Sequence, residues 1–426
     1  MDPITIGLGA LVAVLALIAL RVPIGVSLIV VSFAGIWAIV GQRPALSMIS
    51  TIPYSSTASW TLSSIPMFLL MGYVAFHSGL TRGLFQAARL WWGWLPGGLA
   101  IASLVGASGF AAVSGSSVAC SAAIGRIAVP EMARAGYDMR IATGSVAAGG
   151  TIGALIPPSI ILILFGIQSN SSINDLFLGG LVIGLASLAF YVAAVLVVWA
   201  RNPALLPRET GNTMADRWAV TLQIWPVLIP IGGVLGGMFT GFFTATEAGA
   251  FGALLATILG FARRTLTWRS FRASILDTLI SASSLFIIAV GANLFTRLVA
   301  ISGLSHAIGD FVGGLGLGAT GLLLLIVVIY LILGMFLEPI GALLLTLPLF
   351  LPLVQAEGID LIWFGLLVAK LLEVGMITPP VGLNVFIIHS VARDYVRLEQ
   401  IFAGIIPFLL ADLALVGTML LTRTLF

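Results

Sequence analysis

The sequence contains few charged residues, one lysine and one cysteine. Of its 426 residues, 8% are charged and 60% are hydrophobic, whereas about 25% of a soluble globular domain is charged. This composition excludes a soluble protein. A single cysteine, Cys120, excludes an intramolecular disulfide, and the three isolated histidines lack the spacing of a zinc site. The one lysine, Lys370, is not part of a GxxxxGK[ST] sequence, which argues against ATP hydrolysis by this chain.

Long apolar segments recur along the whole chain and predict a polytopic α-helical membrane protein. No small-residue cleavage site follows the first segment, so we expect a retained span rather than a removed signal peptide. The segments lie at about 4–20, 24–40, 62–78, 96–129, 141–168, 176–200, 219–238, 246–262, 274–300, 318–352, 361–389 and 401–422.

The basic residues predict which connections face the cytoplasm. Five connections hold 14 of the 19 Lys and Arg residues, whereas four others hold none. By the positive-inside rule the first group is cytoplasmic, which makes both termini periplasmic. The basic connections are 79–95, 126–140, 201–217, 263–272 and 390–399, and the base-free ones are 169–175, 239–245, 301–317 and 354–360.

Two apolar segments must therefore enter the membrane and return on the same side. Segment 96–129 lies between two basic connections, and segment 318–352 lies between two base-free ones. Each is interrupted near its middle, the first by Ser-Gly-Ser-Ser at 114–117 and the second by Glu-Pro-Ile-Gly at 338–341. Non-helical backbone is tolerated at membrane depth only where protein buries it or water reaches it. We therefore predict two re-entrant hairpins, one from each side.

An internal repeat relates the two hairpins. Each half contains five full crossings and one hairpin, and because five is odd, the halves are predicted to be inverted, as in many secondary transporters. A shift of 222 residues superposes one glycine and three prolines on the same residue types: Gly153 on Gly375, Pro130 on Pro352, Pro157 on Pro379 and Pro158 on Pro380.

Consecutive prolines inside two apolar spans predict broken helices, because they remove backbone donors and disfavour helical backbone before them. Each break frees carbonyls for a bare cation and presents a helix N-terminus to an anion. One such motif alone is typical of a structural kink, whereas two at one offset, each paired with a hairpin, favour an ion site. The hydroxyls and carbonyls at 114–117 are hard ligands that suit sodium, while Glu338 keeps proton coupling open.

Five stretches of sequence resemble a known transporter family: GFAAVSGSSVACSAAIGRIAVPEMARAGYDMRIATGSVAAGGTIGALIPPSI (109–160), LFLGGL (176–181), FTATEAGA (243–250), GMFLEPIGALLLTLPLFLP (334–352) and GMITPPVGLNVF (375–386). Over essentially the whole chain they resemble the DctM-type large membrane subunit of TRAP transporters, the tripartite ATP-independent periplasmic systems. The resemblance implies a multi-pass protein of the bacterial inner membrane that takes up an organic anion with a sodium gradient. It also implies two partners, a small four-helix DctQ-type membrane subunit and a periplasmic DctP-type binding protein, and no organic cofactor.

The resemblance further implies an elevator-type fold, all-α, with two inverted repeats that each hold five transmembrane helices, one of them broken at Pro-Pro, and one re-entrant hairpin. The mobile transport domain would consist of residues 96–200 and 318–426, which contain the hairpins and broken helices. The scaffold would consist of residues 1–95 and 201–317.

Two sodium sites follow from the same resemblance, each formed by a hairpin tip and its partner broken helix, mostly through backbone carbonyls. The substrate anion would lie between the two tips, and no catalytic residue is expected. At matching positions the first sodium site comprises Ser114, Gly153, Ile156 and Pro157, and the second comprises Gly334, Gly375, Thr378 and Val381. The substrate site comprises Ser116, Ser117, Pro158, Ser159 and Asn384. Ala111 stands where some members of the family have a serine.

Other interpretations remain open at this point. One is a stand-alone sodium- or proton-coupled organic anion symporter or antiporter of the same superfold, which would need no binding protein. Another is an intramembrane enzyme or a structural subunit. Against the enzyme, no His, Cys or paired carboxylates converge on one motif, and a structural role leaves the two proline-broken units unexplained. The roles of Glu247, Glu338 and Glu373 also stay open.

Overall fold

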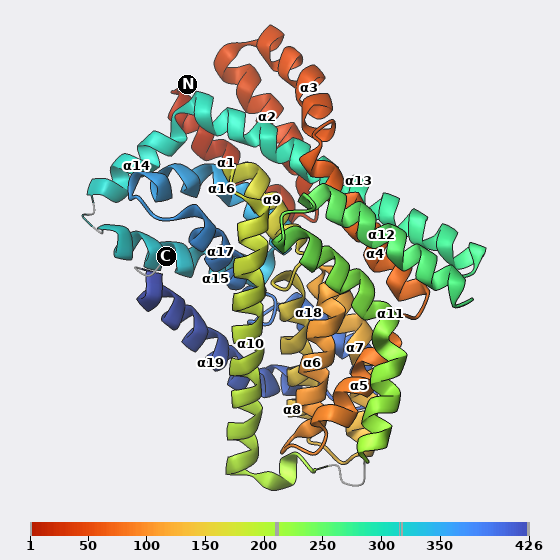
Figure 1. Cartoon of the computed structure of the whole chain (residues 1–426). Helices are drawn as coiled ribbons and strands as arrows, with labels where there is room; N and C mark the ends of the chain where they lie inside the picture. The colour runs from red at the N-terminus through yellow and green to blue at the C-terminus, as the bar shows by residue number, and fades with distance from the viewer. Residues whose placement is uncertain (1, 209–212, 315, 317, 424–426) are drawn as a thin grey trace.

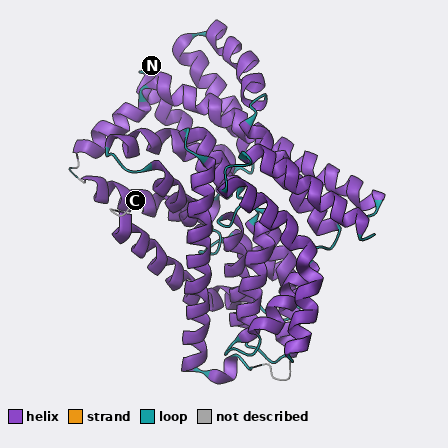
Figure 2. Cartoon of the chain, in the orientation of Figure 1, coloured by secondary structure: helices purple, strands orange, loops and turns teal. Residues whose placement is uncertain are grey.

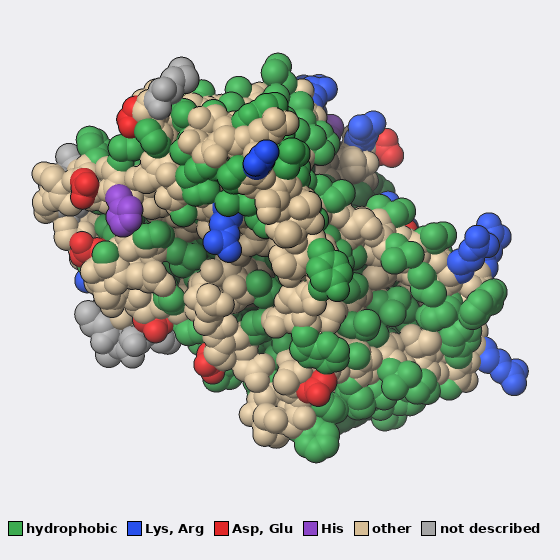
Figure 3. Space-filling view, turned by 90° about the horizontal axis from the view of Figure 1, so that it is seen from above, with side chains coloured by type: hydrophobic (Ala, Val, Ile, Leu, Met, Phe, Trp, Pro, Cys, Tyr) green, Lys and Arg blue, Asp and Glu red, His purple; other side chains and the backbone are tan. Residues whose placement is uncertain are grey.

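The computed structural model describes residues 2–208, 213–314, 316 and 318–423, and this part of the chain is helical without any strand (Figures 1 and 2). The all-α class expected from the sequence is confirmed. Within these residues, seven helices are long and apolar enough to cross a membrane, and a bent helix pair supplies an eighth. Figure 3 shows the outer surface that such a protein needs, with wide areas of hydrophobic side chains and few, scattered charges.

The first half of the chain contains α1 (Pro3–Ala19), α2 (Ile24–Val40), α3 (Gln42–Thr57), α4 (Ser64–His77), α5 (Arg82–Trp92), α6 (Gly98–Ser114), α7 (Ser117–Arg134), α8 (Met139–Thr151), α9 (Ile160–Ser169) and α10 (Ile173–Arg201). The second half contains α11 (Met214–Phe239), α12 (Ala245–Ala262), α13 (Trp268–Ser302), α14 (Leu304–Gly314), α15 (Gly318–Phe336), α16 (Pro339–Ala356), α17 (Leu361–Gly375), α18 (Leu383–Ala392) and α19 (Leu398–Thr422). Helix α3 was not expected, because its residues include many polar side chains and do not form an apolar run.

The helix bounds of the two halves agree at the 222-residue offset. Moving α6 and α7 by 222 residues gives 320–336 and 339–356, and α15 and α16 occupy Gly318–Phe336 and Pro339–Ala356. Helices α2 and α5 correspond equally closely to α12 and α14. The main difference is that α3 and α4 are separated by a bend of 59°, whereas α13 is one helix of 35 residues.

Both helix pairs expected to form hairpins are interrupted where the sequence predicts it. Helix α6 ends at Ser114, Gly115 takes a left-handed conformation with φ 59°, and Ser116 caps α7 by accepting a hydrogen bond from the Ala119 amide. In the second pair the Glu338 carboxylate accepts a hydrogen bond from the Gly341 amide at 3.0 Å and caps α16. Serine and glutamate thus satisfy backbone donors that the interruptions expose.

The two Pro-Pro spans are also interrupted. After α8 a short 3-10 turn, Ile152–Ala154, leads to the cis Pro157-Pro158 peptide, and α9 begins behind the Ser159 cap. After α17 the chain passes through the cis Pro379-Pro380 peptide and Gly382, whose φ is 57°, before α18 begins. The helix breaks predicted from the paired prolines are confirmed.

The helices form two packed groups around the breaks. Helix α13 crosses the upper part of the molecule and packs against α2, α3 and α4, while α12 packs against α4 and α11 (Figure 1). Helix α8 packs against α6, α7, α18 and α19, and α17 packs against α9, α10 and α15. The second group therefore mixes helices of both halves, which brings the two Pro-Pro breaks into one core.

Backbone contact between α8 and α19 depends on glycine. A Cβ atom on Gly404 would overlap the Arg140 carbonyl, and one on Gly144 would overlap the Gly404 carbonyl. Asp138 is the N-cap residue of α8, just before this contact, and it forms a 2.7 Å ion pair with Arg140. Its hydrogen bond with the Arg140 side chain lowers the pKa of the Asp138 carboxyl.

We predict that Gly404→Ala destabilises the protein, because the added methyl group must push α8 and α19 apart, and overpacking costs about 1–3 kcal/mol. Gly417→Ala on the same helix is the matched control, since no atom lies within 4 Å of its Cβ position and alanine favours helix. Thermal unfolding in detergent should show a lower midpoint for the first variant only. Equal midpoints would contradict the packing described here.

Candidate functional site

A cavity of about 1160 Å³ connects both hairpin breaks with α2, α4 and α13. Its lining includes Ser114 and Ser116 of the first break and Glu338 of the second. Elsewhere the lining includes the exposed basic side chains of Arg21 and Arg126. A solute in this cavity therefore meets hydroxyl and carboxylate oxygens at the breaks and positive charge nearer the surface.

A second, smaller cavity of about 60 Å³ lies between the two breaks themselves. Its lining comes from Gly115–Val118 and Glu338–Ile340, together with Glu373 and Met376 at the end of α17 and just beyond it. The two breaks, more than 200 residues apart in the chain, therefore face one another across a space of about two water molecules.

The first hairpin break packs directly on the first Pro-Pro break. A Cβ atom on Gly153 would lie 3.0 Å from the Ser117 Cα atom and 3.1 Å from the Ser116 carbonyl oxygen, and one on Gly115 would overlap the Pro158 carbonyl. Glycine is required at Gly115, and at Gly153 a side chain would fit only if the neighbouring backbone shifted by a few tenths of an ångström. At this junction the Ser114 hydroxyl oxygen is buried and has no hydrogen-bond partner within the described part of the chain.

The second hairpin packs on the second Pro-Pro span in the same manner. A Cβ atom on Gly375 would lie 2.5 Å from the Gly334 Cα atom, so only glycine fits here. The Thr378 hydroxyl donates to the Val374 carbonyl at 2.7 Å, and Val381 directly precedes Gly382. The structure therefore brings together the paired segments that the resemblance implies for each sodium site.

Only two of the five residues expected at the substrate site line either cavity. Ser116 lines both cavities and Ser117 lines the small one, whereas Pro158, Ser159 and Asn384 line neither. The buried Ser159 hydroxyl donates to the Ala154 carbonyl and accepts from the Leu162 amide at 3.2 Å, so it caps α9. Asn384 is fully buried, and neither polar atom of its amide has a hydrogen-bond partner in the described residues.

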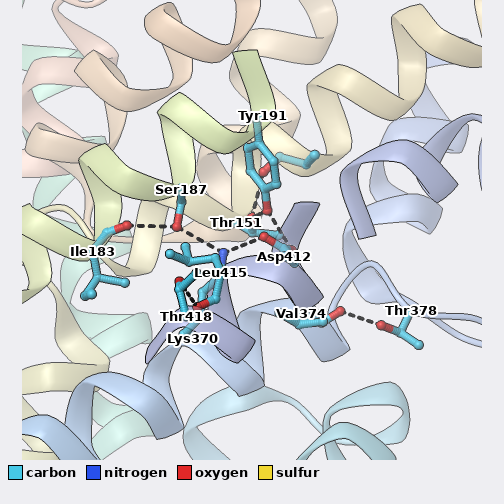
Figure 4. A network of polar contacts seen from close by, with 11 residues as sticks. Thr151, Ile183, Ser187, Tyr191, Lys370, Val374, Thr378, Asp412, Leu415 and Thr418 are labelled. Carbon is cyan, nitrogen blue, oxygen red and sulfur yellow. Dashed lines mark hydrogen bonds and ion pairs between the residues drawn. The ribbon is translucent and has the colours of Figure 1, made fainter. Parts of the chain in front are cut away.

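A buried polar network that the sequence did not predict lies beside the site (Figure 4). Lys370 donates to Asp412 at 2.6 Å and to Ser187 at 3.0 Å, and Tyr191 donates to the other Asp412 oxygen at 2.8 Å. Lys370 is 0% exposed and Asp412 is 1% exposed. The signal was available, because an ionisable residue inside an apolar segment is expected to have a partner or a function.

A second unpredicted contact joins the two halves at the small cavity. The Ser117 hydroxyl donates to Glu373 at 2.6 Å, and both side chains are buried. The other Glu373 carboxylate oxygen has no partner among the described residues. Glu373, whose role the sequence left open, therefore lies at the junction of the first hairpin break with the second broken span.

We predict that Lys370→Met strongly destabilises the protein, because breaking a buried ion pair leaves an uncompensated charge and costs about 3–5 kcal/mol. Replacing both partners, as in Lys370→Met with Asp412→Leu, should recover most of that loss. Arg134→Ala is the surface control: its 2.6 Å pair with Glu131 is exposed, and such pairs contribute less than about 1 kcal/mol. Unfolding midpoints that fall equally in the Lys370 and Arg134 variants would rule out this assignment.

Comparison with known proteins places the chain among membrane permeases. The family model "Tripartite ATP-independent periplasmic transporter, DctM component" matches residues 11–424. The chain is 33% identical over 395 residues to an isethionate TRAP transporter permease of Oleidesulfovibrio alaskensis, which covers 92% of the chain but only 61% of that protein. It is 34% identical over 342 residues to a C4-dicarboxylate TRAP transporter large permease of Pseudomonas aeruginosa, covering 79% of each. Its fold is similar to that of the YdaH transporter of Alcanivorax borkumensis, with a TM-score of 0.66, 15% identity and 90% of each chain covered.

Proposed function

Because the chain belongs to the DctM family of tripartite ATP-independent periplasmic (TRAP) transporters, we propose that it imports an organic anion across the bacterial inner membrane and that a sodium gradient drives this uptake. Its relatives are transport permeases rather than enzymes, and the two named above carry isethionate and C4-dicarboxylates, which are all organic acids. The observation that carries the proposal is the packing of each hairpin on a Pro-Pro break.

Sodium fits the donor atoms that this packing supplies. Helix ends leave carbonyl oxygens without a partner in the next turn, and hard oxygen donors suit hard cations. One ion would be held by Ser114, Gly153, Ile156 and Pro157, and the Ser114 hydroxyl has no hydrogen-bond partner within the described residues. The other ion would be held by Gly334, Gly375, Thr378 and Val381. A bound ion would supply positive charge at the breaks and favour an anion next to them.

The large cavity provides the path for the substrate. In the orientation predicted from the basic residues, the exposed Arg21 and Arg126 side chains mark the cytoplasmic end of the cavity, which supports an inward-facing conformation. Both guanidinium groups attract an organic anion toward that end. The anion itself would bind near Ser116 and Ser117, between the breaks.

The position of the cavity supports the proposed movement of a transport domain. On one side are α2, α4 and α13 of the scaffold, 1–95 and 201–317, and on the other are the hairpins of the transport domain, 96–200 and 318–426. Two of the contacts between them involve glycine: a Cβ atom on Gly72 of α4 would lie 3.0 Å from the Val113 carbonyl oxygen, and Gly341 leaves room for the Ile24 side chain. Small residues at these two contacts suit an elevator motion in which the hairpins carry the bound anion across.

Two partners complete the proposed transporter, a DctQ-type small membrane subunit and a DctP-type binding protein, and both termini of the chain lie in the periplasm. The test uses proteoliposomes that contain the chain with its small subunit. We expect uptake of a labelled organic acid such as a C4-dicarboxylate or isethionate only when the cognate binding protein and an inward sodium gradient are both present. Uptake without the binding protein would instead establish a stand-alone symporter, and uptake driven only by protons would refute sodium coupling.

We further predict that Ser114→Ala raises the sodium concentration for half-maximal uptake about tenfold, because loss of one bond to a charged group costs roughly 1.4 kcal/mol or more. Ser108→Ala is the control on the same helix, since the Ser108 hydroxyl donates to the Leu104 carbonyl. Sodium titrations of both variants at a fixed substrate concentration check this. Overlapping curves for the two variants would exclude Ser114 as a ligand.

A further inference from the structure

Positions 151 and 373 are equivalent at the 222-residue offset and lie two residues before the glycines of the two sodium sites. The first half has Thr151 before Gly153, and the second half has Glu373 before Gly375. Both side chains are fully buried. Thr151 forms a hydrogen bond with a residue of α10, and Glu373 forms one with a residue at the first hairpin break. Each of these side chains therefore connects its own broken span to another part of the molecule.

The Glu373 connection is direct. Its carboxylate accepts a hydrogen bond from Ser117, which follows the first hairpin break and lies against Gly153. The first sodium site would therefore hold Ser117 in place, and Ser117 would hold the end of α17, where the second site begins.

The Thr151 connection passes through two more side chains. Thr151 and Tyr191 are hydrogen-bonded at 2.9 Å, Tyr191 donates to Asp412 at 2.8 Å, and Asp412 pairs with Lys370 at 2.6 Å (Figure 4). The chain of contacts runs from the end of α8 through α10 and α19 to α17. It too links the helix before Gly153 with the helix before Gly375.

We propose that these two connections couple the sodium sites, so that an ion at one site raises the affinity of the other. The inference rests on the sodium sites of the proposed function and adds Tyr191 and Glu373 as positioning residues that do not touch the ions themselves. Buried hydrogen-bond networks hold few alternative arrangements, so ordering one end of such a network lowers the entropy cost of ordering the other. A transporter coupled in this way avoids forms that carry one ion.

The test is the sodium dependence of uptake by the complex with its small subunit and binding protein. Two coupled sites give a Hill coefficient approaching about two, and uncoupled ones give about one. Tyr191→Phe keeps the ring and removes the hydroxyl that joins Thr151 to Asp412, so we expect the coefficient to fall toward one. Combining it with Ser117→Ala, which removes the direct connection, should complete the fall.

Tyr330→Phe is the matched control. Tyr330 is equally buried, and its hydroxyl is bonded to Thr346 at 2.6 Å within the second hairpin, so its loss should leave the Hill coefficient unchanged. If a variant transports too slowly, sodium-dependent thermal stabilisation of the complex reports the same binding curve. A purely structural role for Tyr191 would lower the unfolding midpoint without changing the coefficient, and that result overturns the inference.

A wild-type coefficient near one would also overturn the coupling while leaving sodium-driven uptake intact. Uptake that ignores sodium altogether would refute the proposed function instead, so the two failures are distinguishable. An equal loss of cooperativity in the Tyr191 and Tyr330 variants would count against these particular connections.

Discussion

The structure depends on one constraint, namely that backbone polar groups in a membrane must be covered by protein wherever a helix is interrupted. Within the described residues, two interruptions lie in the hairpins and two at the Pro-Pro pairs, and each hairpin covers one Pro-Pro span. Close cover requires backbone against backbone, which is why Gly115 and Gly375, where a Cβ atom would overlap the facing backbone, lie at the contacts. The same arrangement that hides the interrupted backbone also gathers its oxygen atoms, so structural necessity and the proposed ion binding share one geometry.

A second constraint acts on the side chains around these breaks. Lys370 and Asp412 are removed from solvent. Because the free-energy cost of desolvating two charges can exceed their mutual attraction, the presence of this ion pair does not by itself show that the pair stabilises the fold. Its position is more informative, because Tyr191 donates to Asp412, Ser187 accepts from Lys370, and both link the pair to α10. The network therefore orients α17 and α19 relative to α10 within the helix group that contains both breaks.

Much of this arrangement could be predicted from the sequence, because its causes are local. Paired prolines break a helix wherever they occur inside it, and the Ser-Gly-Ser-Ser run supplies both a left-handed residue and a cap, as Gly115 and Ser116 show. The parts that could not be predicted depend on contacts between distant segments. Ser159 was expected beside the substrate but caps α9, Asn384 lies outside both cavities, and the bond from Ser117 to Glu373 spans 256 residues.

The two halves share their helix bounds but not their polar side chains, and this difference has a physical consequence. At equivalent positions Thr151 is a neutral donor and acceptor, whereas Glu373 is an acid with one carboxylate oxygen unpartnered in the described residues. Proline stands at position 339, equivalent to Ser117, so the mirror-related hydrogen bond cannot form in the other direction. A repeat with identical contacts would give two identical ion sites. Here the two proposed sodium sites share one backbone arrangement, and the unequal side chains give each proposed site a different environment, so the two sites need not fill with equal affinity.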